Sequence, residues 1–426
     1  METARLYEAF LECSSVCTDT RKITKDCLFV ALRGDRFDAN TFAGQALESG
    51  ARYAVIDNPD FDVPGRTLLV EDSLKALQVL ASFHRKQLGL PIVALTGSNG
   101  KTTTKELINA VLSRRYRTGA TIGNLNNHIG VPLTLLGFTR DTEIGIVEMG
   151  ANHQREIAFL CETATPDFGY ITNFGKAHLE GFGGVEGVIK GKSEMYDFLY
   201  NARGKAFVNL DDPIQNVKTS EIARYTFSSV NDADVTISNV TADPMVSLEY
   251  QGMQIRSNLI GRYNAPNIAA AIAIGRYFEV PAAEIRLAIE QYNPNNNRSQ
   301  LMSHGTNRII LDAYNANPSS MAAAIENLKN LSEPNKVAIL GDMFELGDES
   351  FDEHGGIVQL AKQDPGTRYI FAGPEFARHR DDAPTASFFP SFEELAAYLG
   401  DHKFSNATIL IKGSRGMALE RILDFI

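Results

Sequence analysis

The middle of the chain carries short apolar runs that alternate with longer amphipathic stretches. This pattern predicts buried strands and an intervening helix, at residues 92–95 (strand), 101–114 (helix), 144–148 (strand) and 168–172 (strand). Strands that alternate with helices favour a mostly parallel sheet with helices on both faces. Residues 234–259 instead alternate polar with apolar positions, which predicts an antiparallel excursion before an alanine-rich helix at 265–278.

The two ends of the chain show the same alternation. Strands are expected at 26–32, 51–57, 308–312, 337–340, 369–372 and 408–411. Helices are expected at 42–49, 74–88, 319–331 and 392–399. Gly89-Leu90-Pro91 and the polar run 293–297 interrupt this pattern. Because 426 residues exceed one core, we predict three α/β domains at 1–90, 91–297 and 298–426, the last with a Rossmann-like sheet.

Composition narrows the class of protein. Hydrophobic residues make up 44% and charged residues 22%, which is typical of globular domains. The net charge of −11 argues against a surface that wraps nucleic acid. No apolar run approaches the roughly 18 residues of a membrane span, and the chain does not start with a signal pattern, so we expect a cytoplasmic protein. The four cysteines are expected to be free thiols without a chemical role.

The sharpest local motif follows the strand at 92–95 directly and precedes the helix at 101–114. It comprises Thr96, Gly97, Ser98, Asn99, Gly100, Lys101, Thr102 and Thr103. Glycines let backbone N–H groups turn toward a polyphosphate, Lys101 supplies a positive charge, and Thr102 supplies a hydroxyl for Mg²⁺. The motif therefore indicates ATP or GTP, although only two residues separate its glycines. The alternative is a glycine-rich turn before a helix.

Two further polar residues stand at the ends of predicted strands. Glu148 ends the strand 144–148, at the edge where open α/β sheets place their ligands, and its carboxylate suits Mg²⁺. His178 follows the strand 168–172. Taken alone, Glu148 fits a solvated strand end and His178 an ordinary histidine.

Together, four segments of the chain resemble the Mur ligase family, the ATP-dependent amide ligases of peptidoglycan precursor synthesis. They are residues 96–103, Val147-Glu148-Met149-Gly150, 176–180 and 190–196. The resemblance implies a first domain that binds a UDP-sugar, a central ATP-binding domain and a C-terminal ligase domain. It also makes Lys101 the phosphate-binding lysine, and assigns two magnesium ions to Thr102, Glu148, His178 and Lys192. Lys192 matches a lysine that is carbamylated in this family.

The same resemblance implies the remaining ligand contacts. For the adenosine of ATP it indicates Asn267, Arg298, Asp312 and Tyr314. Segments 123–132, 312–318, 340–347 and 412–415 resemble the family members that add D-alanyl-D-alanine to a UDP-N-acetylmuramoyl-tripeptide. The substrate-binding residues expected from these matches are Thr20, Arg21, Asn126, Asn127, Lys412, Ser414 and Arg415. A monomer is expected.

Three positions depart from the family pattern, and two other functions compete with this interpretation. Tyr263 stands where relatives often carry His, His128 replaces an acidic residue, and residues 37–40 lack a Gly-His ending.

The first alternative function is that of a related ligase that uses another amine, and an assay with a panel of amines would distinguish the two. The second is a nucleotide-dependent switch, which needs no second metal set. The third residue of the peptide is not encoded in any motif.

Overall fold

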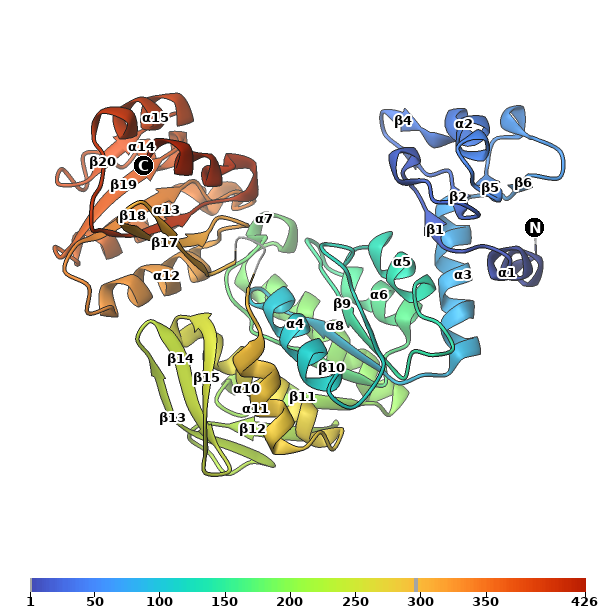
Figure 1. Ribbon diagram of the computed structural model, residues 1–426, viewed down its shortest axis with the longest axis horizontal. Coiled ribbons are helices and arrows are strands. Elements are labelled where there is room, and N and C mark those ends of the chain that lie inside the picture. The colour runs from blue at the N-terminus through green and yellow to red at the C-terminus, as the bar shows by residue number, and fades with distance from the viewer. Residues whose placement is uncertain (1, 295–297) are drawn as a thin grey trace.

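The computed structural model describes residues 2–294 and 298–426, so part of the predicted boundary at 293–297 lies outside the described residues. The chain runs through three larger sheets in succession, which Figure 1 shows as an arc from the blue N-terminal part to the red C-terminal part. The predicted mixture of parallel-sheet α/β units is confirmed. Within the described residues, no helix combines the length and apolar composition needed to cross a membrane.

The first sheet is small and parallel, with the order β1-β2-β5-β6. Its strands are β1 (Val16–Cys17), β2 (Leu28–Val30), β5 (Tyr53–Ile56) and β6 (Thr67–Leu69), beside the hairpin β3 (Arg33–Gly34) and β4 (Phe37–Asp38). Helices α1 (Thr3–Leu11) and α2 (Ala43–Glu48) accompany it. Helix α3 (Ser73–Leu88) leads to the second sheet, and Gly89 ends it because it adopts a left-handed φ of 63°.

The second sheet has nine strands in the order β15-β14-β13-β12-β11-β10-β7-β9-β8. They are β7 (Ile92–Thr96), β8 (Thr118–Ala120), β9 (Ile144–Glu148), β10 (Phe168–Ile171), β11 (Lys205–Asn209), β12 (Ala223–Ser228), β13 (Val235–Ala242), β14 (Met245–Tyr250) and β15 (Met253–Ile260). Among the described pairs of this second sheet, only β13–β14 and β14–β15 are antiparallel, which confirms the predicted excursion. The helices of this part are α4 (Lys101–Leu112), α5 (Gly130–Leu136), α6 (Glu156–Ala164), α7 (Leu179–Phe182), α8 (Val185–Ala202), α9 (Pro213–Lys218), α10 (Ala265–Tyr277) and α11 (Ala282–Gln291).

The third sheet has the order β16-β17-β21-β18-β19-β20. Its strands are β16 (Gln300–His304), β17 (Asn307–Asp312), β18 (Lys336–Gly341), β19 (Thr367–Ala372), β20 (Ser387–Phe389) and β21 (Thr408–Lys412). The edge strand β16 runs antiparallel to β17, and the remaining described pairs are parallel. The helices are α12 (Pro318–Asn330), α13 (Ser350–Lys362), α14 (Pro374–Ala377) and α15 (Phe392–Asp401).

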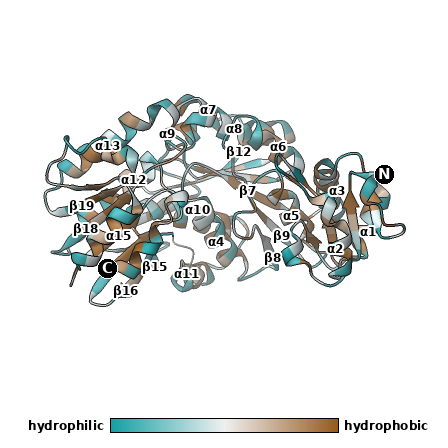
Figure 2. Ribbon diagram, turned by 90° about the horizontal axis from the view of Figure 1, so that it is seen from above, coloured by the Kyte–Doolittle hydropathy of each residue, from teal (hydrophilic) through white to brown (hydrophobic). Residues whose placement is uncertain are grey.

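Burial explains why the central strands form. Every residue of β7 and β9 is buried, as expected for parallel strands covered on both faces. Helix α10 is almost entirely buried, and its alanines allow it to pack against α4. In Figure 2 the hydrophobic colour likewise gathers on strands such as β18 and β19. The rigid sheet therefore presents the loops after β7, β9 and β10 at one edge.

Candidate active site

A cavity of about 970 Å³ lies where the second and third sheets approach each other. Its walls come from the loops after β7, β8, β9 and β10, from the start of α10, and from segments of the C-terminal part. Of the residues predicted to form the site, the cavity is lined by Ser98, Asn99, Gly100, Lys101, Thr102, Thr103, Asn126, Asn127, Glu148, His178, Asn267, Arg298, Asp312, Tyr314 and Lys412. Residues separated widely in sequence thus share one cavity.

The loop after β7 is held in a tight turn by its two glycines. Gly97 has a φ of 139° and lies against Thr172, so that a Cβ atom there would come within 2.0 Å of the Thr172 Oγ1. Gly100, with a φ of 78°, precedes α4 and lies against Asn267. The Asn99 carbonyl accepts a hydrogen bond from the Asn173 amide at 3.0 Å. Side chains would therefore not fit where the backbone must turn.

Lys101 is the first residue of α4 and folds back over the loop. Its Nζ donates to the carbonyl of Gly97 at 2.7 Å and to that of Ser98 at 3.3 Å. Burial lowers the pKa of Lys101 to about 8, although the carboxylate of Glu148 opposes this shift. The loop therefore keeps a cation that an anionic ligand could engage.

Glu148 ends β9 and is 1% exposed. Its Oε1 accepts hydrogen bonds from the Asn126 amide at 2.8 Å and the Thr102 hydroxyl at 3.2 Å. Its Oε2 is buried and has no hydrogen-bond partner among the described residues. An unpartnered buried carboxylate oxygen beside a threonine hydroxyl is the chemistry that a hard cation uses.

A buried lysine supports the position of Glu148. The Glu148 backbone N–H donates to the Thr121 hydroxyl at 3.0 Å. The Thr121 carbonyl in turn accepts a hydrogen bond from Lys105 Nζ at 2.6 Å, and Lys105 is 1% exposed. Lys105 also pairs with Glu106 at 2.7 Å. The backbone that carries the Glu148 carboxylate is thus held by a chain of hydrogen bonds through Thr121 to Lys105.

The other two predicted metal ligands, His178 and Lys192, have different surroundings. Lys192 is fully buried on α8, its Nζ lies 5.0 Å from the centre of the Phe182 ring, and it donates to the Ala151 carbonyl at 3.3 Å. Burial, with the nearby charge of Lys101, lowers the pKa of Lys192 well below its usual value. The imidazole of His178 contacts the carboxylate of Glu345. Across the described chain, no three His, Cys, Asp or Glu side chains gather as a metal site by themselves.

The opposite wall carries charged side chains that contact an aromatic ring or an opposite charge. The Arg298 guanidinium lies 3.7 Å from the centre of the Tyr314 ring. Asp312 pairs with Lys412 at 2.6 Å and accepts a hydrogen bond from the backbone of Ser299 at 3.0 Å. The Lys412 side chain is therefore engaged by Asp312, and the prediction that it binds a dipeptide carboxylate stays a prediction.

Contacts join this wall directly to the loop after β7 (residues 97–100, called the phosphate loop for its predicted role) and to the segment after β10. The Asn317 amide donates to the Asn99 side-chain oxygen at 2.7 Å, and the Ser319 hydroxyl accepts from the backbone N–H of Lys176 at 2.8 Å. The backbone carbonyl of Glu345 also accepts from Glu180 N at 3.3 Å. In this structure the C-terminal part is thus closed onto the loops after β7 and β10.

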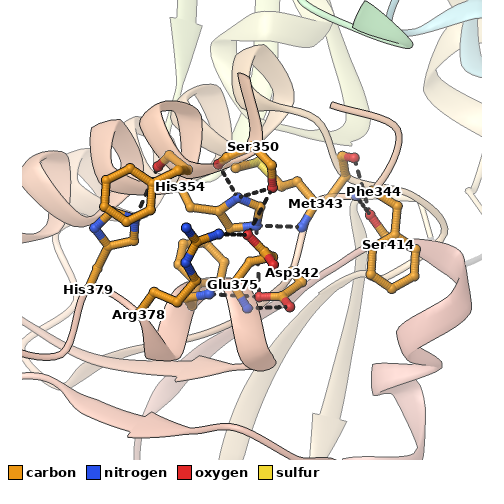
Figure 3. Close-up of polar contacts among 12 residues, drawn as sticks. Asp342, Met343, Phe344, Ser350, His354, Glu375, Arg378, His379 and Ser414 are labelled. Carbon is orange, nitrogen blue, oxygen red and sulfur yellow. Dashed lines mark hydrogen bonds and ion pairs between the residues drawn. The ribbon is translucent and has the colours of Figure 1, made fainter. Parts of the chain in front are cut away.

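The loop that carries Glu345 is anchored by a buried pair, Asp342 and His354, drawn in Figure 3. His354 Nδ1 donates to the Ser350 carbonyl at 2.7 Å, while Nε2 accepts from the Met343 backbone at 3.0 Å. Burial lowers the pKa of His354. These contacts fix a neutral imidazole and with it the start of the loop.

Other predicted residues lie outside the cavity lining. Thr20 and Arg21 lie in the first part of the chain, where Arg21 is exposed and pairs with Asp19 at 2.8 Å. Ser414 is buried and accepts from the Phe344 backbone at 2.8 Å. Arg415 is exposed and pairs with Glu420 at 2.9 Å. Their assignments as substrate-binding residues stay predictions.

The structure also places residues in the site that the sequence did not single out. Asn317 and Glu345 lie inside the matched segments 312–318 and 340–347, but no role was predicted for either, because their contacts with Asn99 and His178 form only through the tertiary structure. Arg155 lines the cavity in a left-handed conformation with a φ of 71°. The four cysteines are free, as predicted.

Comparison with known sequences places the chain in a family. Residues 95–275 match the Mur ligase middle domain, and residues 297–415 match the Mur ligase glutamate ligase domain. The chain is 35% identical to the UDP-N-acetylmuramoyl-tripeptide--D-alanyl-D-alanine ligase of Bacillus subtilis (strain 168), over 96% of this chain and 92% of that protein. It is 36% identical to the protein of the same name from Escherichia coli (strain K12), with coverages of 98% and 94%.

Solved structures agree over nearly the whole chain. A crystal structure of MurF from Acinetobacter baumannii has a TM-score of 0.88 at 30% identity, covering 99% of this chain and 97% of that one. The UDP-N-acetylmuramoylalanyl-D-glutamyl-2,6-diaminopimelate--D-alanyl-D-alanyl ligase of the same organism has a TM-score of 0.83, with the same identity and coverages. MurF from Thermotoga maritima in complex with ADP also has a TM-score of 0.83, at 26% identity and coverages of 98% and 97%. This protein therefore belongs to the Mur ligase family.

Proposed function

We propose that the protein uses ATP to join D-alanyl-D-alanine to a UDP-N-acetylmuramoyl-tripeptide, through an acyl phosphate on the peptide carboxylate. The observation that carries this proposal is the identity of 35–36%, over 96–98% of the chain, to two ligases of that one name. The cavity supports it because a phosphate loop and a second domain form its walls. From the resemblance to the Mur ligase family, we propose that it acts as a monomer.

The residues present fit a magnesium ion. Thr102 and Glu148 would hold it, because the hydroxyl and the carboxylate are adjacent and the Glu148 Oε2 lacks a partner in the described residues. A bound Mg²⁺ supplies positive charge that offsets the negative charge of the transferring phosphoryl group. Lys101 contributes a further positive charge from the loop.

Lys192 and His178 are the residues that we propose would hold a second magnesium ion. The depressed pKa of Lys192 favours its neutral amine. A neutral amine can attack carbon dioxide and release a proton, which leaves a carbamate anion in place of the amine. Such an anion would offer a hard cation oxygen ligands that an ammonium group cannot.

The three parts of the chain receive separate proposed roles. We assign the UDP-sugar to residues 1–90 with Thr20 and Arg21, and ATP to residues 91–297. The dipeptide is assigned to residues 298–426, with Lys412, Ser414 and Arg415, and the peptide end to Asn126 and Asn127. For the adenosine, the proposed contacts remain Asn267, Arg298, Asp312 and Tyr314. Closure of the C-terminal part over the cavity would keep water from the acyl phosphate.

The test measures phosphate release by purified protein with ATP, Mg²⁺, the UDP-linked tripeptide and D-alanyl-D-alanine, omitting each component in turn. Phosphate and a pentapeptide product are expected only when all are present. Turnover with a different amine would keep the chemistry and change the substrate. Phosphate release without any amine or peptide would instead support the nucleotide switch.

A matched pair of variants tests the metal assignment. Glu148→Gln keeps the shape of the side chain but removes its charge, so Mg²⁺-dependent nucleotide binding is expected to weaken in calorimetry. Glu156→Gln is the control, because Glu156 also lines the cavity but is engaged by the backbone N–H groups of Asn152 and His153. Equal Mg²⁺ dependence in both variants would contradict the assignment.

A further inference from the structure

One cation in the cavity has no partner in the described structure. Four Lys or Arg residues line the described cavity, namely Lys101, Arg155, Arg298 and Lys412. Lys101 folds over the phosphate loop, Arg298 lies on Tyr314, and Lys412 pairs with Asp312. Arg155 is exposed, and its guanidinium makes no hydrogen bond, ion pair or ring contact with the described residues. Arg155 is thus free to engage a ligand.

The backbone of Arg155 is held in a conformation that arginine disfavours. Its φ of 71° is in the left-handed region, where glycine fits at no steric cost. Glu194 on α8 fixes this conformation, because its carboxylate accepts from Arg155 N at 2.6 Å and from Ala158 N at 3.0 Å. Strained positions that keep a bulky charged side chain cluster at functional sites.

The position of Arg155 indicates which substrate it faces. It ends the loop that starts after Glu148 and precedes α6, which packs against α3 and α5. Figure 1 shows α6 on the side of the central sheet toward the N-terminal part, whereas the C-terminal segments form the other wall. A peptide that runs from a UDP-sugar in the N-terminal part to the phosphate loop would pass Arg155.

We propose that Arg155 binds a carboxylate of the acceptor peptide other than the one that is activated, an inference that rests on the proposed function. The peptide named for the Acinetobacter baumannii ligase contains glutamyl and 2,6-diaminopimelate residues. Each of these carries a carboxylate beyond those in the peptide bonds and at the reacting end. A guanidinium binds a carboxylate through two parallel N–H···O hydrogen bonds, which fixes its orientation as well as its charge. Arg155 is therefore a specificity residue for an acidic peptide.

Arg155→Gly is the decisive variant, because it removes the guanidinium and suits the left-handed backbone. Its KM for the tripeptide should rise about tenfold or more, as expected for the loss of a charge-assisted pair. The KM values for ATP and D-alanyl-D-alanine should stay unchanged, and the thermal midpoint should stay equal or rise. Arg155→Lys should lie between the wild type and Arg155→Gly, because an ammonium keeps the charge but not the planar fork.

Three acceptor peptides distinguish the source of the carboxylate. One carries glutamyl and diaminopimelate, the second has lysine in place of diaminopimelate, and the third has the glutamyl carboxylate converted to an amide. The ratio of kcat/KM between the wild type and Arg155→Gly should collapse to one with the acceptor that lacks the bound carboxylate. Collapse with the lysine peptide assigns the side chain of the third residue, and collapse with the amide assigns the glutamyl residue.

Several results would overturn the proposal. The first is a kcat/KM ratio between the wild type and Arg155→Gly that equals one with all three acceptors. The second is a ratio above one that is the same with all three acceptors. The third is a rise in the KM for ATP instead of the KM for the peptide. Calorimetric titration of the same peptides into both proteins keeps the test independent of turnover. Absence of turnover by the wild type with every acceptor would contradict the proposed function, whereas equal peptide binding by both proteins would contradict the role of Arg155.

Discussion

Asn317 makes two separable contributions, and substitution should divide them. Its side-chain oxygen accepts from Ser320 N at 2.9 Å and so caps α12, while its amide donates to Asn99 in the phosphate loop at 2.7 Å. Asn317→Ser keeps a capping oxygen but is too short to reach Asn99. Asn317→Ala loses both contacts. The pair therefore separates the stability of the helix from the contact between domains.

The expected magnitudes follow from these two contacts. Loss of the cap costs about 1 kcal/mol, and loss of a neutral hydrogen bond about 1 kcal/mol more. The unfolding free energy should fall by about 2 kcal/mol in Asn317→Ala and by about 1 kcal/mol in Asn317→Ser. A change of 1 kcal/mol lowers the thermal midpoint of a unit of this size by about 4 °C. The KM for ATP should rise about fivefold in both variants, because both remove the hydrogen bond to the Asn99 side chain.

Thermal unfolding and steady-state phosphate release measure the two effects. Ser391→Ala is the control, because Ser391 caps α15 by accepting from Glu394 N at 3.2 Å and does not line the cavity. Ser391→Ala should lower the thermal midpoint as the loss of the α12 cap does, without changing the KM for ATP. An unchanged KM for ATP in Asn317→Ser would refute the reasoning that the contact with Asn99 orders the phosphate loop.

Three further predictions address the loop, its support and the C-terminal anchor. Gly97→Ala should raise the KM for ATP about tenfold, because the new Cβ would meet the Thr172 backbone N at 2.9 Å; an unchanged KM would contradict this. Lys105→Met should lower the unfolding free energy in urea by about 2 kcal/mol, because the buried Thr121 carbonyl loses its donor at 2.6 Å, and Lys75→Met at an exposed lysine is the control. Burial lowers the pKa of His354, so the folded state binds fewer protons than the unfolded state below about pH 6.5, and stability from this group is lost as pH falls. The difference in unfolding free energy between wild type and His354→Leu should therefore shrink from pH 7 to pH 5, and a constant difference would exclude this account.

Buried parallel strands were the most predictable part of the fold. The runs that form β7 and β9 are predominantly apolar because both faces of the sheet are covered. A continuous apolar run predicts a buried strand without knowledge of the strand that pairs with it. The edge strand β16 has no fully buried residue, and it exists because it pairs with β17. Its sequence carries no comparable signal.

The same distinction holds for the site. The phosphate loop and Glu148 were predictable because their residues are contiguous or end a strand. The contact between His178 and Glu345 joins residues 167 positions apart, and the one between Asn99 and Asn317 joins residues 218 positions apart. Local patterns cannot report which side chains meet across such separations. The burial of Lys192 likewise depends on the whole fold, as does the absence of a partner for the Arg155 guanidinium among the described residues.

The cavity walls come from two domains, and this matters for inhibitor design. A compound that touched both the phosphate loop and the segment around Asn317 would bind only to molecules in which these surfaces are already together. Its apparent affinity would equal its intrinsic affinity multiplied by the fraction of closed molecules. A compound that used only the loop after β9, near Arg155, would avoid that factor. Screening against variants such as Asn317→Ser would tell the two kinds of compound apart.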